Sequence, residues 1–144
     1  MDPRKQLSAD GLIGIIRHEY GKIPDHRKDP ERADIRMLDA AMSGYATFSL
    51  KCPSLLNFQD RILSVEEGEN IKSLYGIETV SSDTRMRELL DPVDPKYIAS
   101  PFNKIFAAAQ RGKVLEPYLW KVNNSYLAPM DGTGYFSSTK VKCD

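Results

Sequence analysis

A repeated helix pattern runs from residue 8 to residue 112 and constrains the fold more than any other feature of the sequence. Apolar side chains recur three or four positions apart, and several of these segments follow a residue that can cap a helix or precede a glycine or proline. The pattern predicts helices over about 9–20, 33–49, from Pro53 onward, 69–75, 83–90, and from Ser100 and Pro101 to Gly112. We therefore expect a mainly helical domain.

The helix predicted over 33–49 carries one apolar stripe on its core-facing side. The stripe consists of Ile35, Leu38, Met42 and Tyr45. Small residues flank it, namely Ala40, Ala41, Ser43, Gly44 and Ala46. Side chains of this size let a second helix come close, although a glycine inside a helix costs about 1 kcal/mol. We expect this helix to be tightly packed.

Proline and glycine set the predicted ends of the other helices. Pro53 and Pro101 are placed in first turns, where their missing N–H would be unpaired anyway. Gly76 can take the left-handed closing conformation, and Ile77 can pack back on the helix before it. The helix that starts at Pro53 is expected to end in the acidic residues Glu66, Glu67 and Glu69.

The charges of the chain cancel, because 20 basic residues are matched by 20 acidic ones. The field of the whole chain therefore attracts neither nucleic acid nor anionic membrane, and any DNA contact must come from local patches. No apolar run approaches the roughly 20 residues that cross a bilayer, so we expect a cytoplasmic protein with no membrane partner. Cys52 and Cys143 are expected to be unpaired thiols, and the polar stretch 22–31 an exposed connector.

The pattern changes after residue 113, where short aromatic segments alternate with glycines. Residues 126–138 predict two strands around a turn. Asp131 follows a short apolar segment and precedes Gly132 and Gly134, which leave its carboxylate uncovered, so it is the best single candidate for a metal ligand. The alternative is a turn aspartate that bonds its own backbone, because Asp-Gly is a favoured hairpin turn.

Six segments resemble the amino-terminal third of a bacterial insertion-sequence transposase of the DDE type, in the expected order. They are residues 42–50 (MSGYATFSL), 53–58 (PSLLNF), 70–77 (NIKSLYGI), 82–87 (SDTRMR), 90–93 (LDPV) and 127–138 (LAPMDGTGYFSS). The resemblance implies a helical, DNA-binding domain over 1–113 and, over 114–144, the first β-hairpin of an incomplete ribonuclease-H-like domain. It also implies that Asp131 is the first acid of the catalytic DDE triad.

The chemistry that the resemblance implies uses a pair of Mg²⁺ or Mn²⁺ ions, about 3.5 to 4 Å apart, held by carboxylates. Hard oxygen ligands suit these ions. Asp131 is the one residue of the sequence that matches the triad. We therefore expect this chain to be an amino-terminal fragment that holds no metal stably and has no activity of its own.

The helices predicted over 69–75 and 83–90, joined by residues 76–82, resemble a helix-turn-helix. The second helix of that motif places its first residues at base edges in the major groove, where arginine can bind guanine. Thr84, Arg85 and Arg87 stand near the start of that helix and are our candidates for DNA contact. The joint is longer than the usual three or four residues. An ordinary packed helix pair with solvated arginines explains the pattern equally well.

A second basic stretch has Glu116 as its only acid between residues 104 and 121. Its basic residues are Lys104, Arg111, Lys113 and Lys121. They could bind phosphates, which position a protein on DNA without reading its sequence. The alternative is the solvated face of an amphipathic helix. Tyr118 and Trp120 are expected in the core or in an interface.

The remaining polar candidates have simpler interpretations. Asp91 and Asp94 flank prolines and are interpreted as helix caps. His18 and His26 have no second histidine or cysteine at ligand spacing, so we expect both on the solvated surface.

The function expected from the sequence is DNA binding at the ends of a mobile element, within DNA transposition. The expected partners are DNA, a full-length transposase or a second copy of the chain. The alternative is a stand-alone DNA-binding or protein-interaction module that regulates transposition.

Overall fold

Six helices make up most of residues 7–127, the part of the chain that the computed structural model describes. They are α1 (Ala9–Tyr20), α2 (Met37–Ser49), α3 (Leu55–Leu63), α4 (Gly68–Tyr75), α5 (Asp83–Leu90) and α6 (Pro95–Arg111). The other described elements are the 3₁₀ turns Pro30–Arg32 and Glu116–Tyr118 and the antiparallel strands β1 (Leu119–Trp120) and β2 (Ser125–Tyr126). The mainly helical class is confirmed.

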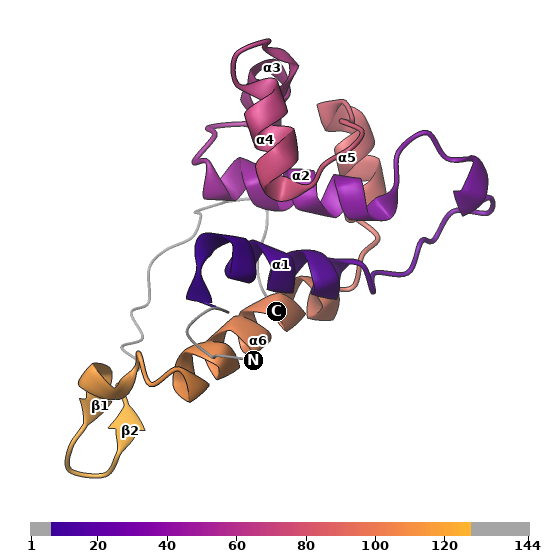
Figure 1. Cartoon of the computed structure of the whole chain (residues 1–144). Helices are drawn as coiled ribbons and strands as arrows, with labels where there is room; N and C mark the ends of the chain where they lie inside the picture. The colour runs from indigo at the N-terminus through magenta and orange to yellow at the C-terminus, as the bar shows by residue number, and fades with distance from the viewer. Residues whose placement is uncertain (1–6, 128–144) are drawn as a thin grey trace, which may run out of the picture.

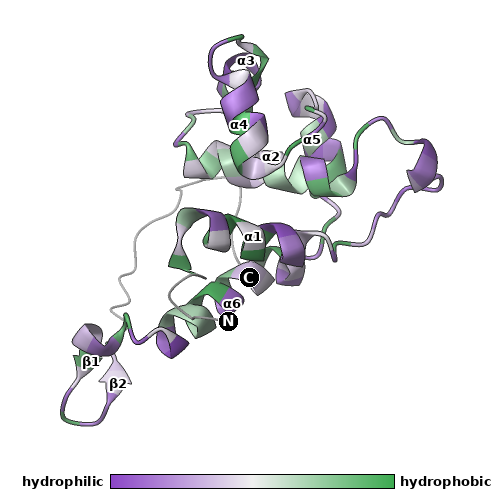
Figure 2. Cartoon of the chain, viewed as in Figure 1, coloured by the Kyte–Doolittle hydropathy of each residue, from purple (hydrophilic) through white to green (hydrophobic). Residues whose placement is uncertain are grey.

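The helix α2 lies at the centre of the fold, with α3, α4 and α5 on one side and α1 on the other, and α6 packs on α1 (Figure 1). Figure 2 shows hydrophobic residues along α2 and α1, whereas the 3₁₀ turn Pro30–Arg32 is hydrophilic. Because helices surround α2, its burial extends well beyond the expected stripe. Its buried residues are Met37, Asp39, Ala40, Ala41, Met42, Ser43, Ala46 and Thr47.

The small residues of α2 allow the close packing that the sequence predicts. A Cβ added at Gly44 would lie 3.1 Å from Leu90 Cδ1 of α5, which is closer than an unstrained contact. Ala40 and Ala46 are fully buried. The absence of larger side chains at these positions lets α5 lie directly on the backbone of α2.

The predicted starts of α2 and α3 are wrong. α2 begins at Met37 rather than near residue 33, since Arg36 is still extended and Ile35 packs on the core from outside the helix. Pro53 precedes α3 rather than opening it, because Ser54 is the cap and its Oγ accepts a hydrogen bond from Asn57 N at 3.1 Å. α3 also ends at Leu63, before the acidic residues that were expected to close it.

The start of α6 differs most from the sequence prediction. The helix begins at Pro95, where Asp94 Oδ1 accepts from Lys96 N at 2.9 Å, and Pro101 lies inside it. Ser100, the expected cap, instead donates its hydroxyl to Glu19 Oε2 of α1 at 2.6 Å. An internal proline removes one helix hydrogen bond. Pro101 is buried, and Ser100 bonds α1 across the helix contact. These tertiary contacts outweigh the missing helix hydrogen bond, so the helix continues through the Ser-Pro pair that was expected to start it.

The connector between α1 and α2 is exposed as expected, apart from the buried Ile23. Its Asp25 forms an ion pair with Arg27, whose Nη2 lies 2.5 Å from Asp25 Oδ2. This contact lowers the pKa of Asp25 to about 2. A local pair therefore orders a segment that the sequence indicates only as polar.

Gly68 forms a close corner between α3 and α4. A Cβ at this position would overlap the backbone oxygen of Ile62, so only glycine fits. In contrast, a Cβ at Gly14, on the exposed side of α1, has nothing within 4 Å.

Replacing each of these glycines with alanine should give opposite results. We predict that Gly68→Ala lowers the free energy of unfolding by about 1–3 kcal/mol, because backbone must move to admit the methyl group. Gly14→Ala should raise it by about 0.5–1 kcal/mol through helix propensity. Urea unfolding followed by circular dichroism measures both, and equal effects of the two changes would contradict the described corner.

Glu19 is a buried carboxylate at the contact between α1 and α6. Lys22 Nζ lies 2.5 Å from its Oε1, and the Ser100 hydroxyl donates to its Oε2. These two hydrogen bonds, first that of Lys22 and then that of Ser100, lower the pKa of Glu19 below its ordinary value of 4.5.

The lowered pKa makes the stability of the α1–α6 contact depend on pH. The contribution of Glu19 is complete above about pH 4.5, where the group is ionised in both states, and is lost as the pH falls through the lower pKa of the folded state. Urea unfolding over this acid range should show a steeper loss of stability for the parent than for Glu19→Gln. The exposed Glu31→Gln is the control, and identical acid profiles for Glu19→Gln and the parent would contradict the assignment.

Candidate nucleic-acid interface

The three predicted DNA-contact residues of α5 are all exposed, but Arg85 and Arg87, two positions apart, lie on opposite flanks of the helix. Met86 and Leu89 are each 1% exposed and fix which side of the helix faces the core. Thr84, Arg85 and Arg87 are consequently exposed on the other side. The helical period of about 3.6 residues predicts that these three side chains point away from the buried Met86 and Leu89.

The first turn of α5 is capped by two side chains. Ser82 Oγ accepts from Arg85 N at 3.3 Å, as expected for the cap. Gln59 Oε1, from the middle of α3, accepts from Asp83 N at 3.2 Å. The role of Gln59 could not be predicted from the sequence. Its hydrogen bond joins residues 24 positions apart, so no local sequence pattern indicates it.

Each arginine of α5 has an acidic neighbour on the same helix. Arg85 Nη1 lies 2.8 Å from Glu88 Oε2, and Arg87 Nη2 lies 3.8 Å from Asp83 Oδ2. Two arginines and two acids therefore balance on α5, and the helix has no net positive charge. Exposed pairs of this kind contribute little to stability, so a phosphate or a base can replace the acid at small cost.

The joint between α4 and α5, residues 76–82, is held by α1 and α2. Arg17 of α1 donates to the carbonyl oxygens of Tyr75, at 3.3 Å, and of Gly76. Gly76 closes α4 with a left-handed φ of 62°, and Ile77 is buried behind it, as predicted. A cation at the carbonyl end of a helix is electrostatically favourable.

Asp39 of α2 holds the middle of the same joint. Its carboxylate is fully buried and accepts from Glu78 N at 3.3 Å and from Thr79 N at 3.4 Å. Arg36 Nη2 lies 3.1 Å from Asp39 Oδ1 and 2.9 Å from Glu78 Oε1. An aspartate amid the small residues of a predicted buried helix, three positions after an arginine, is the signal that could have found this site.

The helix pair around the joint departs from a helix-turn-helix. α4 and α5 make their main contacts with α2 and α3. The turn of four residues, 64–67, joins α3 to α4 instead. Acidic residues open α4, among them Glu67 and Glu69, and they would repel phosphates. The pair with the expected turn length has acidic residues at the start of its second helix, and α5, which carries the predicted arginines, has a longer joint.

The second basic group lies on α6 and after it, apart from α5 (Figure 1). Lys104 and Arg111 are exposed and seven positions apart, so they share one face of α6. Lys113 follows the helix with a left-handed φ of 59°, and its Nζ lies 3.6 Å from Glu116 Oε1. The predicted contact residues thus form two groups rather than one patch.

The expectation that Tyr118 and Trp120 lie in the core is wrong. They are 74% and 50% exposed, at and beside strand β1. Strands β1 and β2 form a hairpin that was not predicted. Its turn contains Asn124, which has a left-handed φ of 52°. Consecutive asparagines were a usable turn signal. Of the strands predicted over 126–138, Tyr126 lies in β2, whereas residues 128–138, including Asp131, lie outside the described residues.

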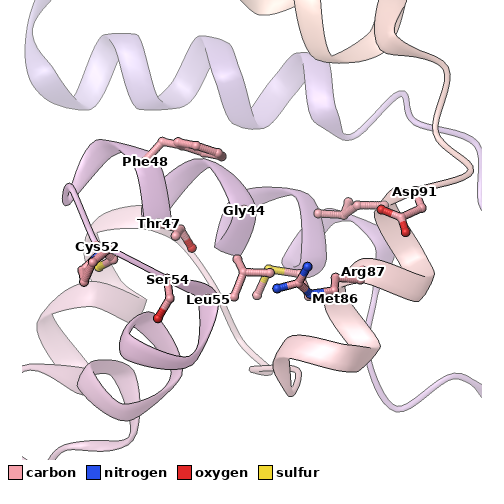
Figure 3. Close-up of a pocket in the computed structure, with 11 residues that line it drawn as sticks. Gly44, Thr47, Phe48, Cys52, Ser54, Leu55, Met86, Arg87 and Asp91 are labelled. Atoms are coloured by element: carbon pink, nitrogen blue, oxygen red, sulfur yellow. The ribbon is translucent and has the colours of Figure 1, made fainter. Parts of the chain in front are cut away.

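An apolar groove of about 490 Å³ opens between α2, the start of α3 and α5 (Figure 3). Leu55 and Met86 lie in its interior, and Arg87 reaches its edge from α5. Phe48, at one side of the groove, is 82% exposed. Cys52 also lines it and is a free thiol, as expected. One predicted DNA-contact residue therefore borders a surface suited to apolar side chains.

The other polar candidates have the roles that the sequence predicts. His18 and His26 are exposed. Asp94 caps the start of α6, and Asp91 stands at the end of α5. Within residues 7–127, no three side chains of the metal-binding types come together.

Comparison with protein-family models, curated proteins and solved structures gave no match. None of the helices described here has both the length and the apolar character needed to cross a membrane.

Proposed function

We propose that this chain is the amino-terminal, DNA-facing part of a DDE-type transposase that acts on the ends of its element in the cytoplasm. The observation that carries the proposal is the exposure of Thr84, Arg85 and Arg87 on α5. In this arrangement the arginines can approach base edges, and the threonine hydroxyl can bond a phosphate or a base.

The segments that resemble the transposase family divide into residues with packing roles and residues without them. In the segment 82–87, Ser82 caps α5 and Met86 is buried, so folding accounts for both. Folding does not account for Thr84, Arg85 and Arg87, whose side chains are exposed. Their presence in a segment shared with the family supports a role in contact with DNA.

The catalytic part of the proposal rests on the resemblance. It assigns Asp131 to the first position of the triad, with Mg²⁺ or Mn²⁺ as the metal of the complete site. The role proposed for this chain is binding, with element DNA, a full-length transposase or a second copy as partners.

The second candidate function is a stand-alone module that regulates transposition by binding DNA or a protein. The apolar groove beside Arg87 and the exposed Phe48 favour the protein-binding form of this candidate. The local charge balance of α5 also makes strong sequence-independent DNA binding less favourable. Binding to element ends with sequence preference separates the proposed function from the protein-binding form of this candidate.

A salt-titrated binding assay tests the proposal. The probes are a duplex with the terminal repeat that borders the gene in its element and a scrambled duplex of the same composition. We predict that the chain prefers the element end and that Arg85→Ala with Arg87→Ala lowers this preference about tenfold or more, because base contacts are lost. Both affinities should fall as salt is raised.

The matched control is Lys104→Ala with Arg111→Ala. If these residues bind phosphates, this variant should weaken binding to both duplexes equally, with a shallower dependence on salt. Equal weak binding of the parent to both duplexes would overturn the proposed function. An unchanged preference in the variant of Arg85 and Arg87 would overturn the assignment to α5.

A further inference from the structure

We infer that Gln59 of α3 is a positioning residue for the DNA-facing first turn of α5, an inference that rests on the proposed function. Its Oε1 accepts from the backbone N–H of Asp83, the first residue of α5, at 3.2 Å. Gln59 is half-buried, so it reaches this turn without being part of the core.

The first turn of α5 needs partners from outside the helix, since the first N–H groups of an α-helix have none within it. Ser82 Oγ takes the N–H of Arg85, and Gln59 Oε1 takes that of Asp83. Ser82 directly precedes the helix and moves with it. Of these two bonds, the one from Gln59 ties the turn to another helix.

Ser81, two residues before α5, is buried, and the other anchors of α5 act further along the helix. Met86 and Leu89 are buried in the core, and Leu90 packs against Gly44 of α2. They fix the middle and the end of α5 and the side that faces inward. Thr84 and Arg85, the exposed residues of the first turn, precede all three anchors. Without Gln59, the turn that carries them would fray while the core remained intact.

A frayed first turn would affect sequence reading more than general affinity. A bidentate arginine–guanine contact requires a fixed direction of the side chain. Contact with phosphates depends mainly on charge and tolerates movement. The expected signature of Gln59 is therefore a change in preference between duplexes rather than a uniform loss of binding.

The experiment compares the full chain with Gln59→Leu on the element-end and scrambled duplexes. The preference for the element end should fall about fivefold, the change expected from one neutral hydrogen bond. Binding to the scrambled duplex should stay as in the parent, and the thermal midpoint should fall by no more than the few degrees that one hydrogen bond accounts for. Gln110→Leu, at an exposed glutamine of α6, is the matched control and should leave all three quantities unchanged.

A conservative variant separates the hydrogen bond from the side chain's other properties. Gln59→Glu keeps an oxygen that accepts from Asp83 N, and its negative charge suits a helix N-terminus. The same charge repels phosphates, so Gln59→Glu should weaken binding to both duplexes by the same factor. Its preference for the element end should equal that of the parent.

The outcomes distinguish the inference from the function on which it rests. A parent with no preference overturns both. A parent with preference, together with Gln59→Leu that keeps it, overturns the role of Gln59 and leaves the proposed function standing. A lowered thermal midpoint with equal losses on both duplexes shows a structural role and also overturns the inference. Loss of the preference for the element end in Gln59→Glu would also overturn the inference.

Discussion

The arrangement of the helices depends on the ion pair and hydrogen bonds of the buried Asp39 carboxylate. A charge without solvent contact persists in a fold only when donors surround it. Arg36 and the N–H groups of Glu78 and Thr79 are these donors. They connect the central helix α2 to the joint between α4 and α5, and Arg17 of α1 holds the beginning of the same joint through Gly76. The loop of seven residues, 76–82, is thereby tied to α1 and α2, and its Ile77 and Ser81 are buried.

This fixed joint explains how α5 presents a face that differs from that of a helix-turn-helix. Its direction is set by α2 and α3, on which it packs, rather than by α4. Thr84, Arg85 and Arg87 face outward, and the acids Asp83 and Glu88 balance the two arginines. The candidate interface on α5, like the whole chain, therefore has no net charge. Recognition of DNA by such a surface depends on the placement of side chains more than on a positive field.

The parts of the fold that the sequence predicted are those set by neighbouring residues. The bounds of α1 and α5 and the left-handed Gly76 follow from caps, apolar spacing and glycine. The start of α6 could not be predicted this way, because Ser100 bonds Glu19, 81 positions away. Bonds between residues distant in the sequence also limit what could be predicted of the candidate nucleic-acid interface. Helical period places Thr84, Arg85 and Arg87 outward, but Asp39 and Gln59 act through bonds to distant backbone groups. Asp131, the residue on which the resemblance to a catalytic site depends, lies outside the described residues.

Hydrogen exchange at the amides of Glu78 and Thr79 tests most directly whether the joint is fixed by Asp39. Both N–H groups bond a buried carboxylate, so exchange should require opening of the core. We expect protection close to that of the amide of Met42, at the centre of α2. Exchange as fast as that of the exposed Lys28 in the connector would contradict this picture. It would show that the Asp39 carboxylate does not hold the joint between α4 and α5.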